Sequence, residues 1–434
     1  MHRASIEKYW IFAPLVTLLA FFALEAASAE PPLSFQAQGV FASVRPSVLQ
    51  IRTLPLGSDS PYNHGSGFVV GPDKLILTNY HVISNVVIDP DRYRLEFLLQ
   101  NGRKGALVVL AVDVVNDLAV VRGDTGLIPG LNLDPRIPEK GSRGFSIGFP
   151  ENQGLTVTEG IVNGLSEDSA RGAIHFSGPM NSGMSGGPAV DTAGRVFGVN
   201  YASLRSTQSI GLVVPATAAI ALLRRAQETL PPAADALFSD LVRQLLANSA
   251  AALDFQPGEK LAVQHFGRFQ APGDPGKFAR CAAMSERDAD KLYRVEQYGC
   301  HFKDETFVAN GLHMGHWFFT HRYVQAPDLG PQRFSRLVES LLRPGDGVTP
   351  TNRLHKTRWH CQSRIVSLSG TRGKTALCLR RYSRFSGLYD IELKLATLGN
   401  TREALLSSLS LYGFGYPESM LFTRRYLEAI TWQP

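Results

Sequence analysis

The first half of the chain contains three residues of the types that nucleophilic catalysis requires: His81, Asp117 and Ser185. A serine hydroxyl is a poor nucleophile at neutral pH, so a neighbouring imidazole must accept its proton. A carboxylate then holds the imidazole in the required tautomer and stabilises its charged form. The three residues therefore predict acyl transfer through a catalytic triad.

Glycines surround Ser185 in the segment 181–190, which reads NSGMSGGPAV. Glycine allows tight backbone turns, in which N–H groups can converge on the oxyanion of a tetrahedral intermediate. We expect the N–H groups of Gly183 and Ser185 to form this oxyanion hole. Taken singly, each triad residue has an ordinary structural explanation. A serine between glycines can belong to a turn, a histidine after a strand can be structural, and an aspartate at the start of a strand can cap a turn. Three such segments in one β-rich region favour catalysis.

The elements that must position these residues are short strands. Residues 35–215 form a series of short apolar or alternating runs separated by Gly, Pro, Asn and Asp, a pattern typical of an all-β barrel or sandwich. The apolar spacing then becomes helical over 217–230 and 234–246, which predicts a helical connector at 216–256. Strand-like runs return in residues 257–434, so we expect an α+β region there.

Residues 36–214 resemble a trypsin-like serine protease domain, most closely the bacterial high-temperature-requirement (HtrA-type) proteases. The order histidine, aspartate, serine is that of chymotrypsin-type enzymes and not that of subtilisins or α/β-hydrolases. The matching segments are GSGFVV at 65–70, LTNYHVI at 77–83, DLAVV at 117–121, VTEGIV at 157–162, GMSGGPAVDTAGRVFGVN at 183–200 and GLVVP at 211–215.

This resemblance implies a chymotrypsin-like domain at 36–215, made of two packed six-stranded barrels with the active site in the crevice between them. It implies a serine-type endopeptidase that forms an acyl-enzyme with protein or peptide substrates. No cofactor and no metal ion are expected.

The resemblance also places the primary substrate pocket on residues before and after Ser185, namely Pro179, Met180, Asn200, Tyr201 and Ala202. No Asp or Glu stands at the base of this pocket to pair with Lys or Arg. We therefore expect cleavage after small or medium aliphatic residues such as Val, Ala or Leu.

Two features depart from the family pattern. Met184 precedes Ser185 where the family usually has Asn or another polar residue, a change that is tolerable because the position contributes mainly backbone. No carboxylate-binding loop of PDZ type is recognisable after residue 256. The family's peptide-tethered regulation and large oligomers are therefore not expected to carry over.

The first 29 residues are typical of a secretory signal peptide. Arg3 and Lys8 give a basic start, residues 9–24 are apolar, and residues 27–29 (Ala-Ser-Ala) offer a cleavage site. The alternative is a membrane anchor formed by residues 9–24, which approach the length of a short span. We expect a periplasmic or secreted protein that has no membrane span after signal cleavage.

The C-terminal region contains all four cysteines: Cys281, Cys300, Cys361 and Cys378. An even number in an exported chain predicts disulfides. Each consecutive pair flanks a candidate β-hairpin, whose strands bring facing residues to a Cα separation of about 4.5–5.5 Å. We therefore predict Cys281–Cys300 and Cys361–Cys378, with a redox switch of the protease as the alternative.

The same region has a layout that suggests two repeated units, 281–342 and 361–411. Each unit has a cysteine pair, a Gly-Leu that opens an apolar strand, and a closing helical stretch. In the second unit this helix would carry Leu405, Leu406 and Leu409 after a capping Asn400. A chance layout is the alternative.

Positive charge is concentrated at the C-terminal end. The whole chain has a formal net charge of +6, whereas residues 257–434 carry 25 Lys and Arg against 16 Asp and Glu, a net +9. This excess of positive charge could bind an anionic partner; the alternative is a basic face that is simply solvated. We expect no nucleic-acid partner.

Two further motifs in this region do not support a binding site. The segment GTRGKT at 370–375 lacks the glycine at 368 that a phosphate-binding loop requires, so we expect a hairpin turn. His313, His316 and His321 would not share one face of a strand, and the sequence gives them no acidic or cysteine co-ligand.

Two functions other than proteolysis remain open. The chain could be a catalytically silent, protease-like binding or scaffold protein, although all three triad residues are present. It could also be a basic C-terminal binding module with the protease as its effector.

Overall fold

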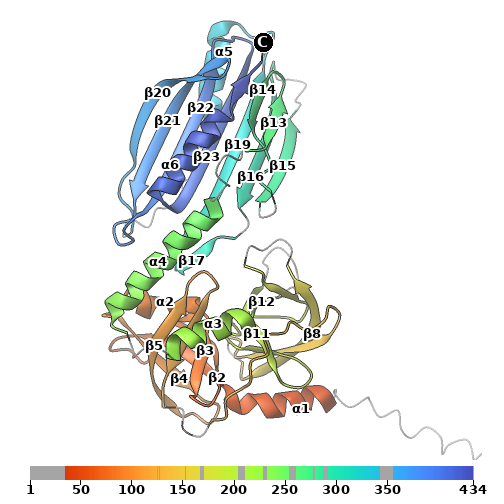
Figure 1. The fold of residues 1–434 in the computed structure, drawn as a ribbon, viewed down its shortest axis with the longest axis vertical. Helices are drawn as coiled ribbons and strands as arrows, with labels where there is room; N and C mark the ends of the chain where they lie inside the picture. The colour runs from red at the N-terminus through yellow and green to blue at the C-terminus, as the bar shows by residue number, and fades with distance from the viewer. Residues whose placement is uncertain are drawn as a thin grey trace, which may run out of the picture.

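The structure is a computed structural model that describes residues 35–124, 126, 128–151, 153–166, 171–203, 211–227, 232–253, 261–276, 279–286, 292–302, 304–342 and 355–433. The signal peptide expected at 1–29 lies outside these residues. Within the described ranges, no helix is long and apolar enough to cross a membrane. Figure 1 shows two β-barrels at one end of the molecule and a large sheet at the other.

Two closed antiparallel barrels of six strands each confirm the predicted chymotrypsin-like fold. The first has the spatial order β1-β2-β3-β6-β5-β4, and its strands are β1 (Val48–Pro55), β2 (Asn63–Val70), β3 (Leu75–Thr78), β4 (Tyr93–Leu98), β5 (Lys104–Asp113) and β6 (Leu118–Arg122). The second has the order β10-β11-β12-β9-β8-β7, and its strands are β7 (Arg143–Gly148), β8 (Thr156–Leu165), β9 (Ile174–Phe176), β10 (Pro188–Val190), β11 (Val196–Ser203) and β12 (Gly211–Pro215). Three short helices accompany the first barrel: α1 (Phe35–Val44), η1 (Arg45–Ser47) and α2 (Tyr80–Ile88).

Alternating apolar residues fill both barrels, because successive side chains of a strand point to opposite faces. Leu49 and Ile51 of β1 are fully buried in the first barrel, and Ile174 and Phe176 of β9 are fully buried in the second. Burying one such side chain contributes roughly 1.5–3 kcal/mol. The packed barrels give the loops at their ends a rigid base.

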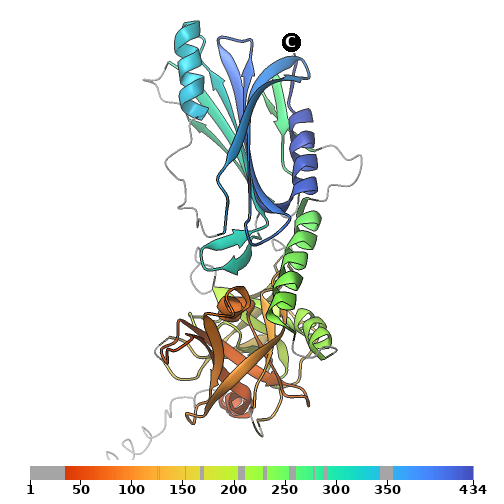
Figure 2. The ribbon, with the colours of Figure 1, turned by 90° about the vertical axis from the view of Figure 1, so that its left-hand side faces the viewer.

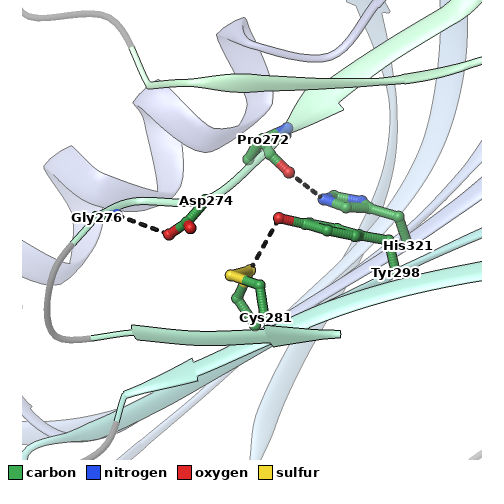
Figure 3. Close-up of a disulfide and its surroundings, with 7 residues drawn as sticks. Pro272, Asp274, Gly276, Cys281, Tyr298 and His321 are labelled. Carbon is green, nitrogen blue, oxygen red and sulfur yellow. Dashed lines mark hydrogen bonds between the residues drawn. A yellow bond between two sulfur atoms is a disulfide. The ribbon is translucent and has the colours of Figure 1, made fainter. Parts of the chain in front are cut away.

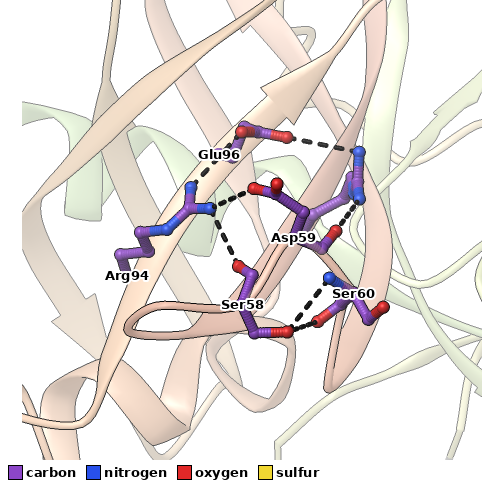
Figure 4. A network of polar contacts seen from close by, with 6 residues as sticks. Ser58, Asp59, Ser60, Arg94 and Glu96 are labelled. Carbon is purple, nitrogen blue, oxygen red and sulfur yellow. Dashed lines mark hydrogen bonds and ion pairs between the residues drawn. The ribbon is translucent and has the colours of Figure 1, made fainter.

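A polar network fixes the loop between β1 and β2 (Figure 4). The buried carboxylate of Glu96 on β4 pairs with Arg52 at 3.2 Å and with Arg94 at 3.3 Å. Arg94 also pairs with Asp59 at 3.3 Å and donates to the carbonyl of Ser58 at 3.0 Å. A buried charge is costly unless it is paired, so these contacts hold the loop that leads into β2.

The connector consists of two helices, α3 (Ala216–Gln227) and α4 (Ala234–Leu253). Helix α4 presents Leu237, Leu241 and Leu245 at intervals of four residues, so they lie on one face. All three are buried in a cluster that also contains residues of the first barrel and of the C-terminal region. Figure 2 shows α4 extending from the barrels to the sheet, so α4 packs the two parts against each other.

The C-terminal region is built on a seven-stranded antiparallel sheet in the order β15-β16-β19-β23-β22-β21-β20. Its strands are β15 (Ala279–Glu286), β16 (Arg294–Phe302), β19 (His316–Gln325), β20 (His360–Leu368), β21 (Thr371–Arg381), β22 (Leu388–Leu398) and β23 (Glu403–Gly415). The smaller elements are β13 (Val263–Phe266), β14 (Phe269–Pro272), β17 (Thr306–Ala309), β18 (Leu312–Met314), β24 (Thr431–Trp432), α5 (Pro331–Leu342) and α6 (Tyr416–Glu428). Helices α5 and α6 cover opposite faces of β22 and β23 (Figure 2).

One predicted helix of this region is wrong. The first closing stretch is indeed helix α5, but Leu405, Leu406 and Leu409 lie in strand β23. Leu405 and Leu409 are buried on the α6 side of the sheet, whereas Leu406 is buried on the α5 side. Because both faces of β23 are covered, its apolar residues do not alternate strictly and can be mistaken for a helical pattern.

The predicted helix cap and unit boundary change accordingly. Asn400 caps no helix; its side-chain oxygen accepts hydrogen bonds from the N–H groups of Arg402 and Glu403 at the start of β23. The helix that closes the second half is α6, which begins at Tyr416, beyond the expected limit at 411.

The structure contains both expected disulfides. Cys281 and Cys300 face each other directly on β15 and β16, with a Cα separation of 4.1 Å. Cys361 and Cys378 face each other on β20 and β21, with a Cα separation of 4.0 Å. Figure 3 shows the first bond beside Tyr298, whose hydroxyl lies 3.4 Å from the sulfur of Cys300.

A hairpin turn joins β20 to β21 as expected, but it is shorter than the segment 370–375. Gly370 lies in the turn, in the left-handed region at φ 78°, whereas residues 371–375 already belong to β21.

Candidate active site

The loop between β5 and β6 positions Asp117. This residue adopts φ 54°, in the left-handed region that few residues other than glycine and Asn or Asp occupy. Its backbone carbonyl accepts hydrogen bonds from the N–H of Tyr80 at 3.1 Å and from the side-chain amide of Asn79 at 2.8 Å. The start of helix α2 therefore fixes the unusual backbone conformation of Asp117.

His81 is the second residue of α2 and faces the Asp117 carboxylate. The backbone N–H of His81 donates to Oδ1 at 2.8 Å, and Nδ1 lies 2.5 Å from Oδ2. An ionised carboxylate can only accept hydrogen bonds, so Nδ1 carries a proton and Nε2 of a neutral ring is left as the acceptor. Burial lowers the pKa of His81, but the charge of Asp117 and its hydrogen bond outweigh burial and raise this pKa above its ordinary value.

The turn that carries Ser185 depends on two glycines. Gly183 has φ 93° and Gly186 has φ 85°, a backbone region that side chains rarely tolerate. A Cβ on Gly186 would also lie only 2.2 Å from the carbonyl oxygen of Ser66. The sequence at this turn therefore reflects a backbone requirement.

Ser66 on β2 connects this turn to the first barrel, a role that its residue type alone does not indicate. Its N–H donates to the carbonyl of Ser185 at 2.8 Å, and its hydroxyl donates to the carbonyl of Gly183 at 2.7 Å. The segment GSG at 65–67 thus brings the two barrels together at the site. The only indication of this role in the sequence is that Ser66 lies in the segment GSGFVV at 65–70, which resembles HtrA-type proteases.

The hydroxyl of Ser185 does not donate to His81 in this structure. It donates to the carbonyl of Tyr201 on β11 at 2.9 Å. A hydroxyl has one proton to donate, so it can serve only one of these acceptors at a time. Within the part of the chain that the structure describes, the backbone N–H groups of Gly183 and Ser185 have no backbone acceptor.

Two residues of the candidate triad, His81 and Ser185, line one cleft of about 520 Å³, whereas Asp117 is buried and reaches the site through its hydrogen bond to His81. Residues of the barrels that line it include His81, Met180, Met184, Ser185, Asn200 and Tyr201. Two of the five expected pocket residues are not placed there: Pro179 is exposed and does not line the cleft, and the side chain of Ala202 lies outside the described residues.

Asn200 has a structural task within the cleft. Its side chain is buried, and its amide donates to the carbonyls of Ile147 at 3.1 Å and Met184 at 3.3 Å. It therefore fixes the residue before Ser185, in addition to lining the cleft.

The C-terminal region supplies three more residues of the cleft wall: Glu305, Phe307 and His313. No motif in the sequence marks this segment, so these three residues could not be predicted. The sequence also gives the histidines no evident acidic partner, whereas in the structure Glu305 lies 2.8 Å from Nδ1 of His313 and 3.9 Å from Nδ1 of His316. His321 lies apart, buried, with Nε2 at 2.9 Å from the carbonyl of Pro272. Among the described residues, no group of three or more His, Cys, Asp or Glu side chains is arranged to hold a metal ion.

The comparisons with known proteins concern the barrels. The family model of the trypsin-like peptidase domain matches residues 65–199. Human serine protease HTRA4 is 34% identical over 194 residues, which cover 41% of this chain and 38% of that protein. Serine endoprotease DegS of Escherichia coli K12 is 30% identical over 180 residues, which cover 38% of this chain and 46% of that protein.

A solved structure of the serine endoprotease from Yersinia pestis is 28% identical, with a TM-score of 0.39, and covers 44% of this chain and 66% of that chain. The chain spans less than half the length of the curated relatives named above. The likeness of residues 65–199 to trypsin-like peptidases is therefore a property of the barrels.

Proposed function

We propose that the chain is an exported serine endopeptidase in which His81 is the general base, Asp117 orients it and Ser185 is the nucleophile. The observation that carries this proposal is the contact of 2.5 Å between Nδ1 of His81 and Oδ2 of the buried Asp117, with His81 and Ser185 lining the same cleft. The trypsin-like domain match over residues 65–199 supports it.

The reaction begins with a rotation of the Ser185 hydroxyl. The hydroxyl leaves the carbonyl of Tyr201 and donates to Nε2 of His81, as catalytic hydrogen bonds often form only with bound substrate. His81 then accepts the proton while Oγ attacks the scissile carbonyl carbon. The N–H groups of Gly183 and Ser185 donate to the resulting oxyanion.

The intermediate collapses when His81 returns the proton to the leaving amine and the peptide C–N bond breaks. An acyl-enzyme remains on Ser185. Water, deprotonated by His81, attacks this ester and releases the acid product, and Ser185 regains its proton. Asp117 stabilises the charged imidazole during both steps.

The primary pocket should accept small or medium aliphatic residues. Met180 and Tyr201 are pocket residues that line the cleft, and neither carries a charge that would pair with Lys or Arg. We therefore expect cleavage after Val, Ala or Leu. A peptide-library profile dominated by Arg and Lys, or by Glu, would refute this preference.

Export follows from two independent features. Disulfides persist in oxidising compartments, and both cysteine pairs are bonded. The N-terminal 29 residues have the composition of a secretory signal peptide. A periplasmic or secreted location accounts for both.

A fluorophosphonate probe tests the catalytic proposal directly. We expect the probe to label the full chain at Ser185 alone, as mapped by peptide mass spectrometry, because only an activated serine reacts. A protein that stays unlabelled, although it is folded and has both disulfides, would instead be a silent protease-like scaffold. In that case the Ser185 hydroxyl would remain hydrogen-bonded to the carbonyl of Tyr201 and would not be activated.

A further inference from the structure

One wall of the active-site cleft comes from outside the region matched by the trypsin-like family model. That match ends at residue 199, yet the hairpin of β17 and β18 reaches from the C-terminal sheet to helix α2 of the first barrel (Figures 1 and 2). Phe307 and His313 of this hairpin line the same cleft as His81 and Ser185.

The hairpin is anchored firmly to the first barrel. Val308, Leu312 and Met314 are all at most 1% exposed, in a cluster that includes Tyr80 of α2. The hydroxyl of Tyr80 donates to the carbonyl of Val308 at 2.7 Å. These buried contacts make the hairpin a fixed part of the cleft.

The second barrel holds the hairpin as well. The guanidinium of Arg171, which precedes β9, donates to the carbonyl of Glu305 at 2.5 Å and to the hydroxyl of Thr306 at 3.0 Å. The hairpin is therefore tied to both barrels, one on each side of the crevice that holds the triad.

Strand geometry directs two rings of the hairpin into the cleft. Because side chains alternate along a strand, Phe307 points away from the face that buries Thr306 and Val308. Phe307 pairs with His313 across the hairpin, so both side chains share one face, and their ring centroids are 5.6 Å apart. Glu305 holds the His313 ring through Nδ1 at 2.8 Å.

These rings complete an aromatic enclosure around the catalytic imidazole. His81 makes an edge-to-face contact with Phe307 at a centroid distance of 6.0 Å, and another with Tyr201 at 6.4 Å. The barrels supply one side of this enclosure and the C-terminal region supplies the other. A substrate side chain that lies against His81 must lie between them.

We propose that the β17–β18 hairpin is a specificity wall, on which Phe307 and His313 pack an apolar side chain of the substrate beside the His81 ring. This inference rests on the proposed protease function. It predicts extended peptide substrates that carry an apolar residue, such as Leu or Phe, at one fixed position near the scissile bond. An apolar pocket discriminates by about tenfold or more between side chains that fill it and side chains that do not.

The test compares two peptides that differ only at this position, which is first located by scanning a peptide library with the unmodified full chain. We expect unmodified enzyme to prefer Leu over Gly there by about tenfold or more in kcat/KM. In Phe307→Ala this ratio should approach one, while preferences at the other substrate positions persist. Phe307→Leu keeps an apolar wall and should show an intermediate ratio, which covers the case in which Phe307→Ala does not fold.

Phe238→Ala is the matched control. It removes the same side chain from the same hydrophobic cluster, but Phe238 packs against Phe385, away from the cleft. The Leu-to-Gly ratio should stay at its original value in this variant. Its labelling by the fluorophosphonate should also be unchanged.

Three results would overturn the inference. Equal Leu-to-Gly ratios in Phe307→Ala, Phe307→Leu and the unmodified enzyme would show that the wall does not select substrates. A uniform rise in activity on every peptide in Phe307→Ala would show an inhibitory plug instead. No position with an apolar preference in the unmodified, labelled enzyme would also exclude the wall. Failure of the unmodified chain to react with the fluorophosphonate is a different result, since it would contradict the protease function itself.

Discussion

The barrels and the C-terminal hairpin build opposite sides of the same cleft by different physical means. On the barrel side, backbone conformation fixes the chemistry: Gly183, Gly186 and Asp117 all occupy the left-handed region. On the hairpin side, side-chain packing fixes the wall: Val308 and Leu312 are buried against the first barrel. Few residue types satisfy the first requirement, and many apolar residues satisfy the second.

This difference explains why only one side of the cleft has a recognisable motif. The same difference predicts that mutations on the two sides of the cleft have different effects. A change of a triad residue should remove catalysis without disturbing the fold, whereas a change on the C-terminal side should alter stability or selectivity and leave the chemistry in place. The following predictions test this separation.

The largest effect is expected from Ser185→Ala. Loss of the nucleophile should lower kcat by about 10⁶-fold, by analogy with the serine of subtilisin. The thermal unfolding of the variant should match that of the unmodified protein, because the turn depends on Gly183 and Gly186. Ser142→Ala is the control, since Ser142 is a half-buried residue that immediately precedes β7 and does not line the cleft. Peptide cleavage that survives in purified Ser185→Ala would contradict the assignment.

The next effect belongs to the C-terminal side. Replacement of Cys361 and Cys378 by serine should lower the free energy of unfolding of this region by about 3 kcal/mol in the chain-entropy estimate. The bond closes a sequence separation of 17 residues and ties the exposed edge strand β20 to β21. Chemical denaturation followed by circular dichroism would measure the change.

Fluorophosphonate labelling of this double variant should persist, because neither cysteine contacts the cleft. Loss of labelling together with native circular dichroism would show that the disulfide controls the site, as a redox switch would.

The sequence predicted the parts of the site that depend on local backbone. His81 and Ser185 line one cleft, Asp117 is hydrogen-bonded to His81, and the glycine turn around Ser185 has the expected left-handed residues. Short strands with frequent turn signals predicted an all-β barrel or sandwich, and the resemblance to trypsin-like proteases implied two barrels. The disulfides followed from hairpin geometry. Each of these features is encoded within a few consecutive residues.

The sequence could not predict the parts that depend on distant contacts. Tyr80 and Val308 are 228 positions apart, so no local pattern announces that the hairpin meets the first barrel. Leu406 in β23 was assigned to a helix because burial on both faces removes the alternation of a strand. In both cases tertiary packing decides the structure, and local propensity does not.

A smaller effect is expected in the pH dependence of catalysis. His81 must be neutral to accept the Ser185 proton, and Asp117 raises the pKa of His81 although burial opposes it. On the acid side, kcat/KM should therefore fall about tenfold per pH unit, with a midpoint above the ordinary value of about 6.5. In Asp117→Asn, an NMR titration of His81 should show a lower pKa. An unshifted titration would mean that Asp117 does not set the protonation of His81.

The smallest effect tests the bond that joins the two sides of the cleft. Val308 is the extra residue of a β-bulge in β17, since Phe307 and Ala309 both pair across the hairpin and Val308 does not. Its carbonyl therefore depends on the hydroxyl of Tyr80, whose pKa is raised well above its ordinary value by burial and by the charge of Asp117. Tyr80 thus remains a neutral donor at all physiological pH values.

Tyr80→Phe keeps the ring and removes only this donor, which leaves the buried Val308 carbonyl without its partner. We expect the free energy of unfolding to fall by about 1–3 kcal/mol. Tyr62→Phe is the control, because the Tyr62 side chain of the same barrel is 53% exposed and its loss should change stability by less than about 0.5 kcal/mol. Amide hydrogen exchange should be faster in Tyr80→Phe than in the unmodified protein, and the increase should be larger in β17 and β18 than in the barrels. If Tyr80→Phe is as stable as Tyr62→Phe and exchange in the hairpin is unchanged, apolar packing alone holds the hairpin on the barrel, and the hydroxyl contributes nothing to the joint between the two sides.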